Sequence, residues 1–480
     1  MGIVFDEKLD LFHLETEHTS YVIGLADKRT YVGHVYYGKR IRLQDMRYLL
    51  RIGEPPYVPS ENNRERCSFY DTFPFEYSGN GVGDYRESAI AVTTVEGQHA
   101  ILPTYVSYGI TKEKPLLAGL PSSFDRDKNA ETLIIHCTDS VLNVNVDLYY
   151  TVFEDTDMIT RSVHICNQDE KPIYLTKALS ACLDMDDNDY EMLTLHGSWA
   201  RERQMDRRAI GYGKTSVGSI KGESSHQEHP FIALLSADAT QDAGEVYGMH
   251  FVYSGNFLAQ AELSQFDSIR MTMGIHPENF VWKLEQGESF AAPEVVMTYS
   301  AEGLGGMTRH YHDMYRGHLI RSEYRDKKRP ILINNWEATY FNFNTEKLLK
   351  IAEQASKLGI EMLVMDDGWF GHRNDDSTSL GDWKVNEQKL PGGLKPLVEQ
   401  VNALGMKFGI WFEPEMISPD SDLYREHPDW AIAIPGRAGS LCRNQYVLDL
   451  SRKEVRDHAF ESVAAVLHSA NIEYVKWDMN

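Results

Sequence analysis

Acidic and aromatic side chains follow the ends of four apolar segments in the last third of the chain. Three of these segments read LVMDD, GIWFE and YVKWD. The residues at the four ends are Trp336, Asp366, Asp367, Trp411, Glu413, Lys476 and Asp478. Carboxylates act as nucleophiles, acids and bases, and indole rings offer flat apolar faces to a ligand. If the four segments end at one place, the pattern predicts a site for nucleophilic or acid/base chemistry.

Lys476 and Asp478 are two residues apart at the end of the last segment, so in a strand their side chains lie on one face. The ammonium group favours the ionised form of the neighbouring carboxylate, which is the form that a nucleophile needs. The pair also fits a salt bridge that only satisfies two charges at the end of a sheet. The three further acids and two tryptophans at equivalent segment ends favour the first interpretation.

Asp366 and Asp367 are adjacent carboxylates whose mutual repulsion costs stability unless each accepts hydrogen bonds. Vicinal hydroxyl groups of a sugar can supply such donors, and so can water or backbone amides. Arg443 offers a fixed fork of donors to hydroxyls, although it fits an ordinary surface ion pair equally well. Trp336 and Trp411 add ring faces that suit a pyranose or a hydrophobic core. Each of these candidate substrate contacts therefore has a structural alternative.

The segments that carry these residues alternate with amphipathic helices, which predicts a βα repeat. We expect strands over 331–336, 361–366, 407–412 and 473–478, and helices over 345–358, 394–404 and 453–470. Gly359 and Gly405 follow two of the helices, where they supply the left-handed residue after the last turn. In a (β/α)8 barrel the carboxyl ends of the strands meet at one mouth. An open doubly wound sheet is the alternative, but its glycine fingerprint is missing.

The chain before this repeat has apolar residues at every second position from about residue 20 to residue 300, as in strands with one buried face. Residues 142–152 and 269–275 show the alternation most clearly. Near Gly303 the pattern changes to a helix, predicted over 307–319, and a charged stretch follows. We therefore predict two domains, an all-β domain with its linking helix over 1–328 and the βα repeat over 329–480.

Composition argues against several classes of protein. A formal net charge of -23 opposes binding to the phosphate backbone of a nucleic acid. The chain has no apolar run long enough for a membrane-spanning helix, and residues 1–14 lack the features of a secretory signal. The five cysteines are widely spaced without a CxxC pair, so neither a disulfide framework nor a zinc site is expected. We expect a cytoplasmic protein without metal or other cofactor and without nucleic-acid or membrane partners.

Four short motifs make a family resemblance specific. EYVKWDMN (473–480) resembles the nucleophile motif of glycoside hydrolase family 36, and MDDGWF (365–370) and WFEPEM (411–416) resemble its second and third barrel-strand motifs. GVGDYRESA (81–89) is similar to a glycine-aspartate-arginine motif of the family's N-terminal domain, with Ser88 where proline is commoner. The resemblance spans nearly the whole chain and implies a multidomain fold, an N-terminal β-supersandwich followed by a (β/α)8 TIM barrel.

The resemblance also implies an activity, that of a retaining α-galactosidase with Asp478 as its nucleophile. The residues implied to contact galactose are Asp366, Asp367, Arg443 and Lys476 at its hydroxyls, Trp336 and Trp411 along the pocket, and Asn480 beside the sugar. The implied substrates are galactose-containing oligosaccharides such as melibiose, raffinose and stachyose, and family members are often homotetramers. The implied reaction is a double displacement through a covalent galactosyl-enzyme, without a metal.

A full barrel needs about 250 residues, whereas the pattern after residue 330 yields four strands. We therefore expect only about the first four barrel strands in this chain and an acid/base beyond residue 480. Residues 1–480 alone are expected to be inactive and poorly soluble, because the last strand would leave an unpaired edge. Three alternatives stay open: a preference for N-acetylgalactosamine, galactosyl transfer to another sugar, and galactoside binding without turnover.

Overall fold

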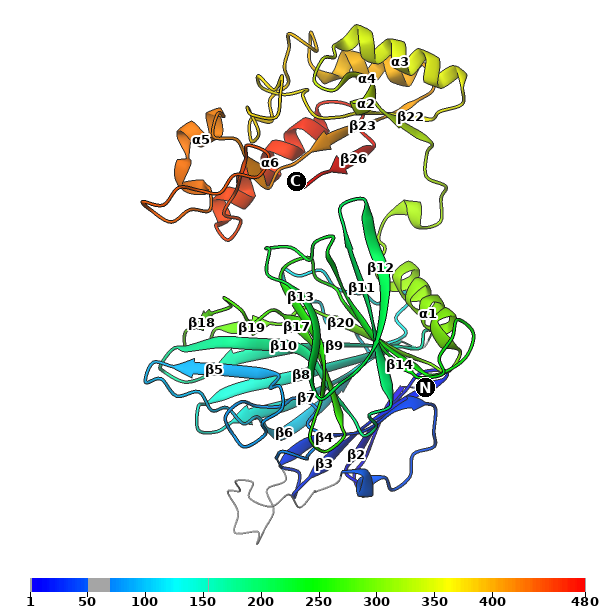
Figure 1. Cartoon of the computed structure of the whole chain (residues 1–480), viewed down its shortest axis with the longest axis vertical. Helices are drawn as coiled ribbons and strands as arrows, with labels where there is room; N and C mark the ends of the chain where they lie inside the picture. The colour runs from blue at the N-terminus through cyan, green and yellow to red at the C-terminus, as the bar shows by residue number, and fades with distance from the viewer. Residues whose placement is uncertain (1, 51–69, 154, 480) are drawn as a thin grey trace. The chain divides into compact units, whose positions relative to one another are not determined.

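The chain divides into two compact units, residues 1–325 and residues 326–480 (Figure 1). The computed structural model describes residues 2–50, 70–153 and 155–479. Asn480, a predicted substrate contact, lies outside the described residues. Within the described ranges, no helix is both long and apolar enough to cross a lipid bilayer.

The described part of the first unit is built from three antiparallel sheets. The four-stranded sheet has the order β1 (Gly2–Asp6), β2 (Leu11–Glu15), β3 (Thr19–Ala26), β4 (Tyr31–Lys39). The six-stranded sheet has the order β13 (Gly213–Ser219), β16 (Phe257–Leu263), β17 (Ile269–Ile275), β10 (Ile173–Met185), β18 (Trp282–Leu284), and β5 (Ile90–Thr94) also pairs with β10. The ten-stranded sheet has the order β12 (Arg201–Ala209), β11 (Tyr190–Ser198), β14 (Glu228–Ser236), β15 (Val246–Phe251), β20 (Val295–Ser300), β9 (Met158–Asn167), β8 (Val144–Phe153), β7 (Ala130–Asp139), β6 (Thr104–Thr111), and β19 (Ser289–Ala291) also pairs with β9. Two short 3₁₀ helices cover Arg47–Leu49 and Glu323–Arg325.

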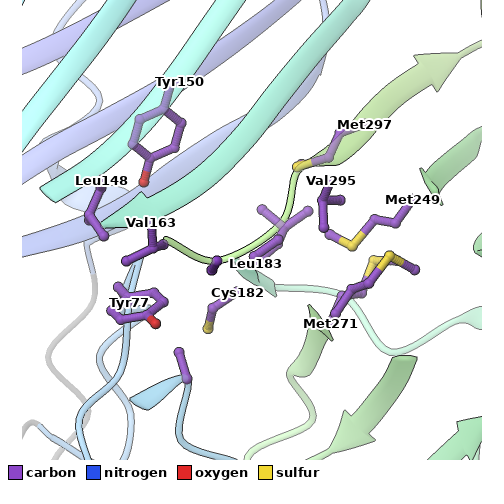
Figure 2. Packing of buried hydrophobic residues seen from close by; sticks show 14 of the residues in the cluster. Tyr77, Leu148, Tyr150, Val163, Cys182, Leu183, Met249, Met271, Val295 and Met297 are labelled. Carbon is purple, nitrogen blue, oxygen red and sulfur yellow. The ribbon is translucent and has the colours of Figure 1, made fainter. Parts of the chain in front are cut away.

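The six-stranded and ten-stranded sheets contribute to one buried apolar cluster (Figure 2). Leu148 on β8 and Val163 on β9 belong to the same cluster as Cys182 on β10 and Met271 on β17. Burying a side chain of this size stabilises the fold by about 1.5–3 kcal/mol. The apolar positions of the period-two pattern therefore form this core. The pattern also predicted one exposed face, but the polar positions of β17 are buried too, since Arg270 is 1% exposed.

Helix α1 (Gly303–His318) follows β20 and packs on the ten-stranded sheet. It begins four residues before the predicted 307–319. Gly303 has a φ of 66°, and a Cβ atom there would lie 2.4 Å from the carbonyl oxygen of Thr240, so the helix start requires glycine. Met307, Tyr311 and Met314 point into an apolar cluster with residues of the sheet. Burial of this apolar stripe, rather than helix propensity, holds α1 in place.

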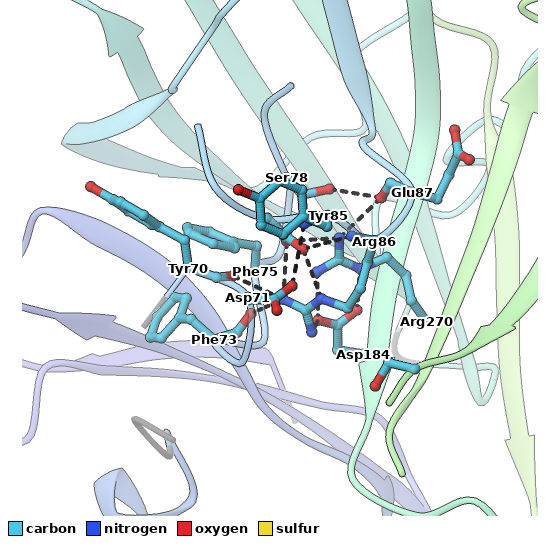
Figure 3. A network of polar contacts seen from close by, with 12 residues as sticks. Tyr70, Asp71, Phe73, Phe75, Ser78, Tyr85, Arg86, Glu87, Asp184 and Arg270 are labelled. Atoms are coloured by element: carbon cyan, nitrogen blue, oxygen red, sulfur yellow. Dashed lines mark hydrogen bonds and ion pairs between the residues drawn. The ribbon is translucent and has the colours of Figure 1, made fainter. Parts of the chain in front are cut away.

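The motif at residues 81–89 contributes two charged side chains to a buried network (Figure 3). Arg86 Nε donates to Asp84 Oδ1 at 2.8 Å, and Arg86 Nη1 donates to Asp184 Oδ2 at 3.1 Å. Arg270 Nε and Nη2 donate to the two oxygens of Asp184 at 2.6 and 2.8 Å, and its Nη1 lies 2.9 Å from Asp84 Oδ2. Each of the four side chains is at most 5% exposed. Two guanidinium groups and two carboxylates thus neutralise one another inside the unit.

Glu87 lies beside this network and forms ion pairs with Lys177 and Lys214. Burial alone would raise the pKa of the Glu87 carboxyl, but the two ammonium groups outweigh it and lower the pKa from 4.5 to about 2. A carboxyl group whose pKa is lower in the folded state stabilises the fold above its unfolded pKa and loses that contribution as the pH falls towards the folded value.

We therefore expect Glu87→Gln to reduce the free energy of unfolding by on the order of 3 kcal/mol at pH 7. The difference from the wild type should shrink between about pH 4.5 and pH 2. Urea unfolding at a series of pH values measures it. Glu96→Gln, which removes an exposed pair with Lys171, is the matched control and should have a much smaller effect. Equal effects of the two substitutions would contradict the prediction.

The second unit contains a four-stranded parallel sheet with the strand order β21, β22, β23, β26. The strands of this sheet are β21 (Leu332–Asn334), β22 (Met362–Met365), β23 (Lys407–Phe412) and β26 (Tyr474–Trp477). The helices are α2 (Trp336–Thr339), α3 (Thr345–Lys357), α4 (Leu394–Ala403), α5 (Asp422–Glu426), α6 (Lys453–His468) and the 3₁₀ helix Pro428–Trp430. A small antiparallel sheet pairs β24 (Met416–Ile417) with β25 (Tyr446–Val447).

The four strands and three long helices predicted for this unit agree with the structure to within two residues at each end. Apolar residues of α3 and α4, among them Leu348 and Val401, share a buried cluster with Leu363 on β22 and Phe408 on β23. Gly359 and Gly405 follow the two helices with φ values of 82° and 78°, as predicted. The short helices α2 and α5 and the β24–β25 pair were not predicted, because segments of two to five residues carry no clear period.

Candidate active site

The site lies at the carboxyl edge of the parallel sheet. Because the strands are parallel and in register, with Trp411 opposite Lys476, the residues that follow them meet at the same edge. Asp366 follows β22 directly, Glu413 follows β23, and Asp478 follows β26. The expected clustering of acids at strand ends is therefore present in the structure.

Lys476 connects two of the carboxylates. Its ammonium Nζ donates to Asp366 Oδ2 at 2.8 Å and lies 3.9 Å from Asp478 Oδ2. Asp366 also accepts from the side chain of Asn334, and its backbone N–H donates to Asn335 Oδ1 at 2.8 Å. The Asp366 side chain is 3% exposed, whereas about a third of Lys476 and of Asp478 is exposed. The cluster therefore has a buried base and a part that a ligand can reach.

Asp478 is held in a fixed orientation. Trp411 Nε1 donates to its Oδ2 at 3.0 Å, and the backbone N–H of Met479 donates to its Oδ1 at 3.1 Å. The backbone N–H of Asp478 itself donates to the carbonyl oxygen of Phe412 at 2.8 Å, so the residue continues the pairing of β26 with β23. Donors on both oxygens and an ammonium group nearby stabilise the negative charge that a nucleophilic carboxylate carries.

Asp367 faces a different cation from Asp366. Arg373 donates two hydrogen bonds to its carboxylate, from Nε to Oδ1 at 3.0 Å and from Nη2 to Oδ2 at 2.9 Å. Burial raises the pKa of the Asp367 carboxyl, Arg373 opposes this effect, and the charge of Asp366 adds to it. The repulsion between the two adjacent acids is thus relieved by protein cations on both sides.

The two predicted tryptophans lie in different surroundings. Trp411 is 2% exposed and packs near Trp383 and Phe370, so its indole N–H, rather than an open ring face, reaches the site. Trp336 begins α2, is half-buried, and its ring meets Phe341 edge-on at 5.0 Å. An indole that is partly open to solvent, such as Trp336, can cover one side of a ligand. The buried Trp411 contributes to the site through its N–H, which donates to Asp478.

Arg443 lies in an exposed turn before β25 and has a left-handed φ of 47°. Arg443 thus lies on a separate loop of the same unit. The predicted residues that directly contact one another are Asp366, Lys476, Asp478 and Trp411.

Several polar residues at this edge were not predicted. Asn334 and Asn335 orient Asp366, Arg373 pairs with Asp367, and Gln445 donates to the buried Glu413 at 2.9 Å. Asn334 is the last residue of β21 and Asn335 follows it directly, so the strand-end argument used for the acids also applies to them. Arg373 carries no such signal, because it lies in a loop and its role depends on the path of that loop.

Comparison with known proteins places this arrangement in a family. Residues 30–285 match the glycosyl hydrolase family 36 N-terminal domain, and residues 289–480 match the Melibiase family. The chain is 47% identical to the α-galactosidase AgaA of Geobacillus stearothermophilus over 482 residues, which is 100% of this chain and 66% of AgaA.

Two solved structures of AgaA variants from the same organism have the same fold. One, in complex with raffinose, has a TM-score of 0.96 and 47% identity over 98% of this chain and 66% of that one. The other, in complex with stachyose, has a TM-score of 0.95 and 47% identity over 97% of this chain and 65% of that one. The chain thus spans slightly less than two thirds of the length of these relatives. With its N-terminal region and its melibiase region both matched, the chain belongs to glycosyl hydrolase family 36.

Proposed function

We propose that the protein is a retaining α-galactosidase that removes terminal α-galactosyl residues from oligosaccharides such as melibiose, raffinose and stachyose. The observation that carries the proposal is the placement of Asp478, partly exposed at a strand end, between the ammonium group of Lys476 and the indole N–H of Trp411. The activity that AgaA is named for and its complexes with raffinose and stachyose support the substrate class.

In the proposed reaction Asp478 attacks the anomeric carbon while a second carboxylic acid, about 5 Å or somewhat more away, protonates the leaving oxygen. The same acid then acts as a base and activates the water that releases galactose, so the product keeps its anomeric configuration. We propose that this acid/base lies beyond residue 480 and that the four parallel strands belong to a (β/α)8 barrel following a β-supersandwich.

Galactose hydroxyls are proposed to bind at the polar residues around Asp478. The proposed contacts are Asp366, Asp367, Lys476 and Arg443 for the hydroxyls, Trp336 and Trp411 for the pocket, and Asn480 beside the sugar. Asp366 and Lys476 support this role by their direct contact next to Asp478, because an acceptor and a donor side by side match adjacent hydroxyl groups.

The test is hydrolysis of 4-nitrophenyl α-galactoside by the natural full-length protein, with proton NMR of the sugar released in the first minutes. We expect α-galactose to appear first, because two displacements restore the starting configuration. The β anomer appearing first would contradict the retaining mechanism. The N-acetyl-α-galactosaminide and an added acceptor sugar are the comparisons: a preference for either would favour an N-acetylgalactosaminidase or a transferase. Binding of galactose without turnover would indicate a lectin-like role.

We further propose a cytoplasmic homotetramer. Cys137, Cys166, Cys182 and Cys442 are free thiols, in keeping with a reducing compartment. The assembly is proposed from the family resemblance, and light scattering coupled to gel filtration of the full-length protein measures it.

A further inference from the structure

Arg373 is among the most deeply buried charged residues of the second unit, with 1% of its side chain exposed. Nε and Nη2 hold both oxygens of Asp367, and Nη1 donates to the carbonyl oxygen of Thr378 at 2.8 Å. A two-point contact of this kind fixes the plane of a carboxylate as well as its position. An ionised carboxylate has about four acceptor sites. The two-point contact uses two of them, and the backbone N–H of Gly368 also donates to Asp367.

The loop that carries Arg373 is itself fixed by Lys389. Lys389 Nζ donates to the carbonyl oxygens of Phe341, Gly368 and Arg373 at 3.0, 2.8 and 2.8 Å. Phe341 is the residue against which Trp336 packs, so this ammonium group ties the loop after β21 to the loop after β22. Arg373 therefore cannot relax towards solvent without breaking several backbone contacts.

Three charged groups face Asp367, namely Asp366, Arg373 and Lys389. Burial raises the pKa of Asp367, and the guanidinium group of Arg373 opposes that shift. Burial lowers the pKa of Lys389, while Asp367 raises it. Arg373 is the one of the three that directly contacts the Asp367 carboxylate through hydrogen bonds in the described structure. It is thus the group that fixes the orientation of this buried acid, and it opposes the effect of burial on the acid's pKa.

We propose that Arg373 is the positioning residue of Asp367, holding its carboxylate as a fixed, ionised acceptor for a hydroxyl group of the bound galactosyl ring. The assignment rests on the proposed function, since it gives Asp367 its sugar. Asp366 and Asp367 then have separate supports, Lys476 for the first and Arg373 for the second. Lys476 is open enough to touch the substrate, whereas Arg373 acts only through Asp367.

The test is Arg373→Met in the natural full-length protein with 4-nitrophenyl α-galactoside. KM should rise about 10- to 100-fold with a smaller change in kcat, because a charge-assisted hydrogen bond to the sugar is lost. The acidic limb of the pH profile of kcat/KM should move up by about 1–3 pH units, since Asp367 loses its neighbouring cation and is protonated at higher pH. Arg373→Lys keeps the charge without the fork and should recover part of both effects.

Arg425→Met, which removes an exposed arginine paired with Asp420 and Asp422, is the matched control and should leave KM and the pH limb unchanged. If Arg373→Met alone does not fold, Asp367→Asn is compared with the double variant Asp367→Asn/Arg373→Met, whose KM should agree with it within about twofold. The positioning role would be wrong if Arg373→Met kept the KM and the pH limb of the wild-type protein. It would also be wrong if the double variant had a much higher KM than Asp367→Asn. Either result would leave the proposed function standing. A wild type that neither binds nor hydrolyses α-galactosides would overturn the proposed function and this role with it.

Discussion

Replacing Asp478 with asparagine is expected to lower kcat for α-galactoside hydrolysis by at least about 10⁴-fold while galactose still binds. The amide cannot form the covalent galactosyl-enzyme, so the first displacement is lost. The surroundings should remain intact, because Lys476 keeps its contact with Asp366 and the backbone pairing of residue 478 with Phe412 does not involve the side chain. Initial rates and calorimetric titration with galactose, both on the full-length protein, measure the two quantities.

Asp457→Asn is the control for the loss of one carboxylate from the same unit. Asp457 lies on α6, is half exposed and pairs with Lys453, so its replacement should leave kcat nearly unchanged.

A second variant, Asp478→Gly, tests the role of the carboxylate more specifically. Azide can enter the vacated space, attack the anomeric carbon from the same side and displace nitrophenolate, which yields β-galactosyl azide. Retained turnover in Asp478→Asn, or no β-galactosyl azide from Asp478→Gly, would argue against a nucleophile at this position.

Replacing Arg270 with methionine is expected to lower the free energy of unfolding of the first unit by about 3–5 kcal/mol. The substitution removes the cation that contacts both Asp84 and Asp184 and leaves two buried carboxylates with Arg86 alone (Figure 3). Arg86 alone cannot neutralise two carboxylates, and an uncompensated buried charge costs far more than the pair contributes, because these side chains are almost fully shielded from water. Denaturant unfolding followed by far-UV circular dichroism measures the change.

Arg208→Met is the matched control, since Arg208 is exposed on β12 and lies 3.8 Å from the exposed Asp206. It should change the free energy of unfolding by less than about 0.5 kcal/mol. Adding Asp184→Asn to Arg270→Met should recover part of the loss, because Arg86 then has only one carboxylate, Asp84, to neutralise. Equal stabilities of the Arg270 and Arg208 variants would show that the network contributes nothing beyond an exposed ion pair.

Much of the fold was predictable because its elements have local signals. Apolar residues at every second position gave strands in the first unit, and apolar stripes followed by Gly359 and Gly405 gave the helices of the second. The acids at strand ends were predictable for the same reason, since a parallel sheet brings the ends of its strands to one edge. These features depend on residues within about ten positions of one another, and a period of two or 3.6 encodes them directly.

The amino-acid sequence by itself determined that a lysine and an aspartate, Lys476 and Asp478, share one face at the end of a strand. Tertiary structure alone decided which partner each charge takes. Asp366 and Asp367 have the same chemistry and adjacent positions, yet one meets Lys476 from a strand 110 residues away and the other meets Arg373 in the next loop. Partner choice depends on how distant segments pack, and no local period encodes that. For the same reason the pairing of Arg86 with Asp184, 98 residues away, was not predicted.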